Sequence, residues 1–68
     1  MSFEKVVLQK VAKVLKQDRQ AYFAYGTLFV ECTEDQARKV FHKLSKDYGL
    51  GKVQIAKTPE EFSFDFVA

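Results

Sequence analysis

Residues 20–32, QAYFAYGTLFVEC, are the most apolar and β-prone stretch of the chain and decide its fold. As a single strand this stretch would be roughly 43 Å long. A helix of about fifteen residues spans only roughly 22 Å, so most of such a strand would have nothing to pack against. Gly26 followed by Thr27 is typical of a two-residue type II′ turn. We therefore expect two strands that reverse at Gly26-Thr27, with one long strand over 20–32 as the alternative.

The hairpin sorts this stretch into two faces. The predicted pairs form a continuous apolar face: Tyr25 with Leu28, Phe23 with Val30, and Ala21 with Cys32. The other face is mixed, as a solvated sheet face requires, and carries Gln20, Tyr22, Ala24, Phe29 and Glu31. In one long strand, Phe23, Tyr25 and Phe29 would instead lie opposite Leu28 and Val30.

Residues 3–17 have the pattern of an amphipathic helix. Ser2 suits the N-cap position, and Glu4 in the first turn complements the helix dipole. The apolar stripe consists of Phe3, Val7, Val11, Val14 and Leu15. The polar residues 17–20 are expected to connect this helix to the hairpin.

A second helix is expected between Thr33 and Gly49. Thr33 and Gln36 have the spacing of a capping box at its start. Gly49 followed by Leu50 suits a left-handed C-cap with its hydrophobic contact. Its apolar stripe consists of Ala37, Val40, Phe41, Leu44 and Tyr48.

Two further strands are expected at 52–57 and 62–66, joined by a turn with Pro59 at its second position. Phe62, Phe64 and Phe66 alternate with polar residues and form one buried row. The prediction is one α+β domain over residues 1–68, a two-layer sandwich in the order α-β-β-α-β-β. Its four-stranded antiparallel sheet is covered by both helices on one face. The alternative order is α-β-α-β-β, with one long strand over 20–32.

Length and composition restrict the class of protein. A chain of 68 residues is near the size at which a single core barely offsets chain entropy, so self-association would help. The one cysteine, Cys32, cannot form an internal disulfide, and a reducing, cytoplasmic location is the simplest fit. No apolar run approaches the roughly 20 residues of a membrane span, so we expect no membrane partner.

The residues that carry chemistry are few, and we expect no enzyme. His42 is the only histidine and falls on the polar side of the second helix. Cys32 is expected on the inward strand face, where a cysteine behaves as a small hydrophobe. The glycines are explained by turns and caps, which leaves no phosphate-binding loop. We also expect no cofactor, no metal site and no small-molecule substrate.

Surface recognition is the function class that remains. Tyr22 and Phe29 lie on the sheet face away from the helices, and Val67 is expected to add to them. Aromatic residues are favoured at interface cores, so we expect contact with a protein partner, or a homodimer, on this face or along a free strand edge.

Nucleic-acid binding is the alternative. The polar faces of the two helices are rich in cations, and these are Lys5, Lys13, Lys16, Arg38, Lys39, Lys43 and Lys46. Side by side, the helices would present them as one basic layer. The formal net charge of only +2, and the expected position of Asp65 on the open sheet face, weigh against this reading.

Overall fold

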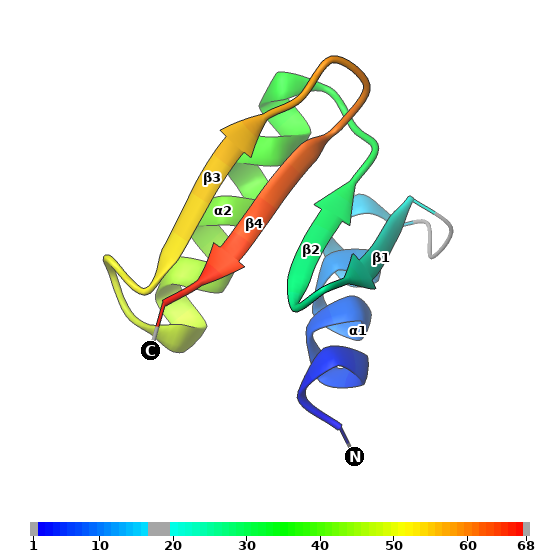
Figure 1. The fold of residues 1–68 in the computed structure, drawn as a ribbon. Coiled ribbons are helices and arrows are strands. Elements are labelled where there is room, and N and C mark those ends of the chain that lie inside the picture. Colours follow the sequence, from blue (N-terminus) through cyan, green and yellow to red (C-terminus); the bar gives the residue numbers. More distant parts are fainter. Residues whose placement is uncertain (1, 17–19, 68) are drawn as a thin grey trace.

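The computed structural model describes residues 2–16 and 20–67, which form two helices and four strands (Figure 1). The elements are α1 (Phe3–Leu15), β1 (Ala21–Ala24), β2 (Thr27–Val30), α2 (Glu34–Tyr48), β3 (Val53–Lys57) and β4 (Phe62–Phe66). The predicted α-β-β-α-β-β order is confirmed, and the alternative of one long strand is wrong. Of the predicted connection at 17–20, residues 17–19 lie outside the described residues.

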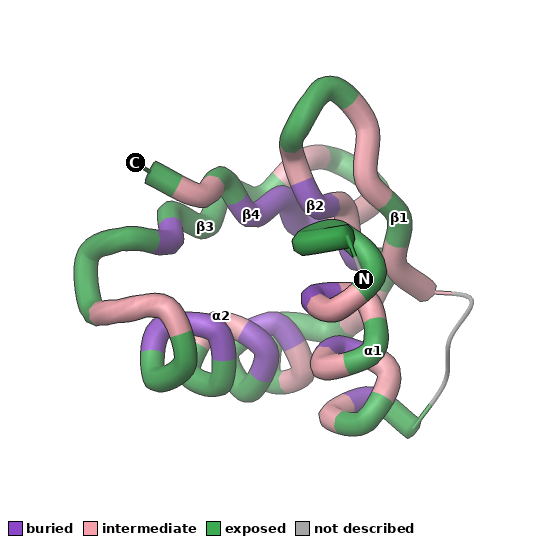
Figure 2. Tube along the Cα trace, turned by 90° about the horizontal axis from the view of Figure 1, so that it is seen from below, coloured by how far each residue is buried: buried purple, intermediate pink, exposed green. Residues whose placement is uncertain are grey.

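The four strands form one antiparallel sheet in the order β1-β2-β4-β3. Each hairpin contributes one edge strand and one central strand, and the two hairpins join through β2 and β4. Helix α1 packs against β1 and helix α2 against β3. Figure 2 shows both helices on the same side of the sheet. The fold is therefore the predicted two-layer sandwich with one open sheet face.

The β1–β2 turn differs from the prediction. Its central residues are Tyr25 and Gly26, which have φ angles of 54° and 79°. Positive φ at both positions is the requirement of a type I′ turn, not of the predicted type II′ turn. Thr27 is therefore free to join β2, where its Oγ1 donates a 2.6 Å hydrogen bond to Oδ1 of Asp65.

The pairing changes with the turn, but the faces do not. Phe23 pairs with Leu28 and not with Val30, and Val30 pairs with Ala21. Moving the turn back by one residue shifts each pair by two positions along β2, so every paired side chain keeps its predicted face. The two exceptions are Tyr25, which leaves the sheet, and Cys32, which follows the end of β2 and is half-buried.

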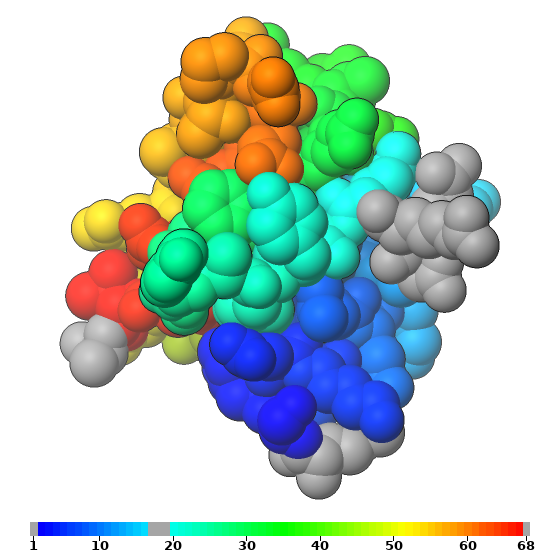
Figure 3. Space-filling model, turned by 45° about the vertical axis from the view of Figure 1, so that its right-hand side comes forward, coloured from blue at the N-terminus to red at the C-terminus, as the bar shows by residue number. Residues whose placement is uncertain are grey.

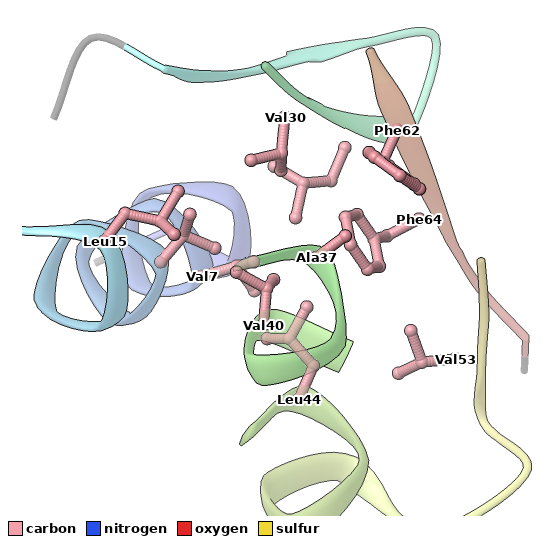
Figure 4. Packing of buried hydrophobic residues seen from close by; sticks show 11 residues of the cluster. Val7, Leu15, Val30, Ala37, Val40, Leu44, Val53, Phe62 and Phe64 are labelled. Atoms are coloured by element: carbon pink, nitrogen blue, oxygen red, sulfur yellow. The ribbon is translucent and has the colours of Figure 1, made fainter. Parts of the chain in front are cut away.

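The core fills the space between the helices and the inner sheet face. Figure 4 shows Val7 and Leu15 of α1, and Val40 and Leu44 of α2, pointing toward the sheet. Phe64, at the centre of β4, is fully buried against them. One end of this core is closed by four aromatic rings with centroids 5.1 to 6.4 Å apart, from Phe3, Phe23, Tyr48 and Phe66.

The helix caps follow the sequence signals at the N-terminal ends. Ser2 Oγ accepts a hydrogen bond from the Lys5 N–H, and Thr33 and Gln36 form the full capping box. The C-terminal ends differ from the prediction. Helix α1 ends at Leu15, because Lys16 takes the left-handed conformation with φ 60°. Gly49 does cap α2, but with φ 110° and ψ 137°, and Leu50 is 90% exposed instead of packing on the end of the helix.

Candidate binding surfaces

The open sheet face consists of the outward side chains of the four strands. The register sets two cross-strand rows on it. One row is Tyr22, Phe29, Ser63 and Ala56, and the next row is Ala24, Thr27, Asp65 and Gln54. Both helices lie behind the sheet in Figure 1, so no described segment crosses this face. Figure 3 shows the β1–β2 hairpin open to solvent between α1 (blue) and the β3–β4 turn (orange).

Tyr22 and Phe29 form the centre of the exposed apolar surface on this face, and we call them the aromatic pair. They are direct cross-strand partners, and their rings stack with centroids 5.3 Å apart and an angle of 18° between the planes. Tyr22 is 48% exposed, and its Oη donates a 2.8 Å hydrogen bond to Oε1 of Glu61. The two predicted contact residues therefore do meet, and the ring of Tyr22 is held in one orientation.

Val67 does not join the aromatic pair. It is exposed on the same face, but it follows the end of β4 at Phe66. Phe29 pairs with Ser63, which is four residues earlier. Four residues of extended chain cover about 13 Å, and Asp65 lies between them on the same face. Val67 thus belongs to the far end of the sheet, toward the β1–β2 turn.

Carboxylates surround the hydroxyl of Tyr22. The pKa of Tyr22 is raised first by its hydrogen bond to Glu61, then by partial desolvation, and then by the negative charges of Glu61, Glu31 and Glu60. Asp65 adds a fourth carboxylate in the neighbouring row. Within the described part of the chain, no Lys or Arg forms an ion pair with any of the four. The open sheet face is therefore negative.

The helix layer has the opposite charge. A shallow hollow of about 550 Å³ lies over the outer surface of α2 beside α1. We call it the basic hollow, and its lining is Val14, Arg38, Lys39, His42, Lys43 and Lys46. Four of the seven predicted cations thus meet in one place. Among residues 2–16 and 20–67, no carboxylate lines the hollow.

The three predicted cations of α1 are distributed differently. Lys13 is the neighbour of Val14 and flanks the hollow. Lys5 is nine residues before Val14, which at about 100° per residue places it on the opposite side of α1. Lys16 is the left-handed C-cap of α1, beyond the last helical residue, and it does not line the hollow. The helices therefore do not present one continuous layer of all seven cations.

A small ion-pair network joins the two helices beside the hollow. Nζ of Lys10 lies 2.7 Å from Oδ2 of Asp47, and Nζ of Lys43 lies 3.4 Å from the same atom. The hydrogen bond from Lys10 is the largest cause of the lowered pKa of Asp47, and it raises the pKa of Lys10 in return. This network leaves Lys39 and Lys46 without an acidic partner among the described residues.

The remaining candidate groups are dispersed. His42 is exposed in the basic hollow, and Cys32 is half-buried between β2 and α2, where burial raises the pKa of its thiol. Among residues 2–16 and 20–67, no three His, Cys, Asp or Glu side chains gather in an arrangement that could hold a metal ion. Neither helix, as far as the structure describes it, is long and apolar enough to cross a membrane.

Sequence reasoning missed one exposed aromatic residue. Tyr25 is fully exposed at the tip of the β1–β2 turn, whereas the prediction placed it inside the sheet. The signal was present, because a glycine at the second central position follows the Asn-Gly pattern of type I′ turns. Tyrosine at the first position concealed it, since bulky residues rarely take positive φ.

Comparison of the chain with protein-family models, with curated proteins and with solved structures found no match.

Proposed function

We propose that the protein is a small binding module that acts by contact with a protein partner through its open sheet face. The observation that carries this proposal is the aromatic pair, in which the half-exposed Tyr22 stacks on the partly buried Phe29, on the sheet face away from both helices. Tyrosine and phenylalanine anchors of this kind supply most of the binding energy at protein interfaces.

The hydrogen bond between Tyr22 and Glu61 supports this role. Ordering a free side chain at an interface costs about 0.5 to 1.5 kcal/mol. The ring of Tyr22 is already held by Glu61 on one side and by Phe29 on the other, so much of this cost is met in the unbound protein. The two rings bury little area in the core. Their ordered arrangement therefore contributes more to binding than to the stability of the fold.

The charge of the face favours a partner of a different kind over a homodimer. Two copies meeting face to face would bring Glu31, Glu61 and Asp65 close to their own copies. Like charges in an interface cost several kcal/mol and select against such pairing. A partner surface that carries Lys or Arg would instead match these carboxylates, and its cations could lie over the ring of Tyr22.

The experiment is partner capture with variants of the aromatic pair. The variants Tyr22→Ser and Phe29→Ser are expected to lose the captured partner while their circular dichroism spectra stay unchanged. Leu50→Ser is the matched control, because it removes a large exposed apolar side chain away from the sheet face. Retention of the partner by both sheet-face variants, or equal loss in Leu50→Ser, would contradict the proposal.

A second measurement maps the contact directly. Addition of the captured partner to isotope-labelled protein should shift the amide resonances of β1, β2 and β4 more than those of α2. Sedimentation of the free protein over a range of concentrations then tests the homodimer. We expect a monomer, since the acidic face repels a second copy of itself.

A further inference from the structure

The opposite side of the molecule carries a second surface that the proposed protein contact does not use. The basic hollow is lined by four cations, an imidazole and one valine, and it lies on the helix layer. The open sheet face is on the other side of the sandwich, so both surfaces can be occupied at once (Figure 2).

We infer that the basic hollow binds the phosphate backbone of duplex DNA, independently of base sequence. The cations are spaced regularly along α2, because Lys43 follows Lys39 by four residues and Lys46 follows Lys43 by three, which are rises of about 6 and about 4.5 Å. This gives a straight array of positive charge that suits a line of phosphates. Lysine acts as a point charge and contacts phosphates without reading bases.

The chemistry of the hollow argues against other polyanions. No Phe or Tyr among the described residues lines it, whereas single-stranded nucleic acids are held by stacking on aromatic rings. Most of the apolar stripe of each helix is buried in the core, so neither helix presents the broad apolar face with which an amphipathic helix enters an anionic membrane. Duplex RNA is recognised through 2′-hydroxyl contacts in its minor groove, and a helix face without projecting loops does not supply them.

Lys39 and Lys46 are the residues that test the inference. Arg38 has an exposed ion pair with Glu34 at 3.8 Å, and Lys43 is engaged by Asp47, so substitution of either would also change the helix itself. Lys39 and Lys46 are exposed and have no acidic partner among the described residues, so their charges can be removed with little effect on folding.

The experiment measures binding of a fluorescein-labelled duplex DNA of mixed sequence by anisotropy, at several salt concentrations. About four phosphate contacts predict a slope of about −3.6 in log K against log salt, which is roughly a 150-fold loss of affinity between 50 and 200 mM salt. The double variant Lys39→Gln/Lys46→Gln is expected to reduce that slope by about 2.

The control removes the same charge outside the basic hollow. Lys5→Gln/Lys16→Gln is expected to keep the wild-type slope, because neither residue lines the hollow. Equal weakening in this control would show attraction by net charge alone and would overturn the inference. So would a Kd above about 1 mM at 50 mM salt, or tighter binding of single-stranded DNA, duplex RNA or phosphatidylserine vesicles through Lys39 and Lys46. None of these outcomes affects the sheet-face proposal, because its variants are at Tyr22 and Phe29, on the opposite side of the sandwich from the basic hollow.

Discussion

At the scale of single residues, the β1–β2 turn contains a side chain that is unfavourable for its backbone conformation. Tyr25 has φ 54°, a region that bulky residues rarely take, and its ring is fully exposed. The left-handed region costs an L-residue with a Cβ about 1 to 2 kcal/mol. Gly26 also has a positive φ angle but avoids this cost, because it has no side chain.

The variants Tyr25→Asn and Gly26→Ala are expected to change stability in opposite directions. Asn at the first turn position should raise the free energy of unfolding by about 0.5 kcal/mol, since Asn-Gly is the favoured type I′ pair. Alanine at position 26 should lower it by about 1 kcal/mol through backbone strain alone, because the added Cβ meets nothing within 4 Å. Urea unfolding measures both, and a neutral Gly26→Ala would contradict the positive φ.

The hydroxyl of Tyr22 should reveal its carboxylate surroundings by titration. Its pKa is raised above the ordinary value of 10.0, chiefly by the hydrogen bond to Glu61. The protonated hydroxyl is therefore the form that the fold stabilises, fully so below pH 10, and this contribution is lost as the pH rises through the pKa of the folded state. NMR titration of the ring carbon should show a lower pKa in Glu61→Gln, and an unchanged pKa would contradict the bond.

At the scale of elements, burial depends on the place of a strand in the sheet as much as on its pattern. Ile55 and Leu28 both belong to inward-facing rows, and each has Phe64 as a cross-strand partner. Leu28 in the central strand β2 is fully buried, whereas Ile55 in the edge strand β3 is 40% exposed. The same type of residue thus contributes differently to the core.

Truncation to alanine should show this difference. Leu28→Ala removes a side chain from the centre of the core and is expected to cost about 2 to 5 kcal/mol, which is enough to unfold a domain of this size. Ile55→Ala is expected to cost only about 1 kcal/mol, because this side chain is 40% exposed and buries less area than Leu28. Chemical denaturation compares them, and Leu28→Val provides a measurable substitute if Leu28→Ala does not fold.

At the scale of the whole molecule, opposite charges lie on opposite layers. The aromatic pair is surrounded by carboxylates on the sheet side, and the basic hollow lies on the helix side. If both proposals hold, the protein can connect a basic protein surface to a DNA backbone. Tyr22→Ser should then abolish protein binding with no change in the salt slope for DNA. Lys39→Gln/Lys46→Gln should reduce the salt slope for DNA with no change in protein binding.

The Lys10–Asp47 bridge connects the two helices, and its contribution should depend on pH. The pKa of Asp47 is lowered, chiefly by the hydrogen bond from Lys10, so the bridge stabilises the fold above the ordinary carboxyl pKa of 3.8. This contribution is lost as the pH falls through the lower pKa of the folded state. Asp47→Asn should therefore be less stable than the wild type at pH 7, and thermal unfolding should show the two converging in acid. A constant difference at all pH values would contradict the bridge.

The features that could be predicted from the sequence are those with a local period or a local cap. The i, i+4 stripe of α1, the alternation of β4 and the capping box at Thr33 each depend on residues a few positions apart. The capping box is confirmed in full, and the stripe is buried at Val7, Val11 and Leu15. In β4, Ser63 is buried along with Phe62 and Phe64, and Phe66 is half-buried. The predicted faces of the β1–β2 hairpin are correct although the predicted turn is not. Side chains alternate along a strand with a period of two, and the pairing register also shifts by two residues.

The sequence by itself therefore determined the elements, their inward faces and the presence of aromatic residues on an open sheet. Only the tertiary structure decided which of the candidate residues are neighbours. It placed Val14 of α1 beside the four cations of α2, left Lys5 and Lys16 outside the lining of this hollow, and placed Val67 away from Tyr22 and Phe29. The physical reason is that strand order and helix packing join residues far apart in the chain. No local period or cap encodes such long-range neighbours.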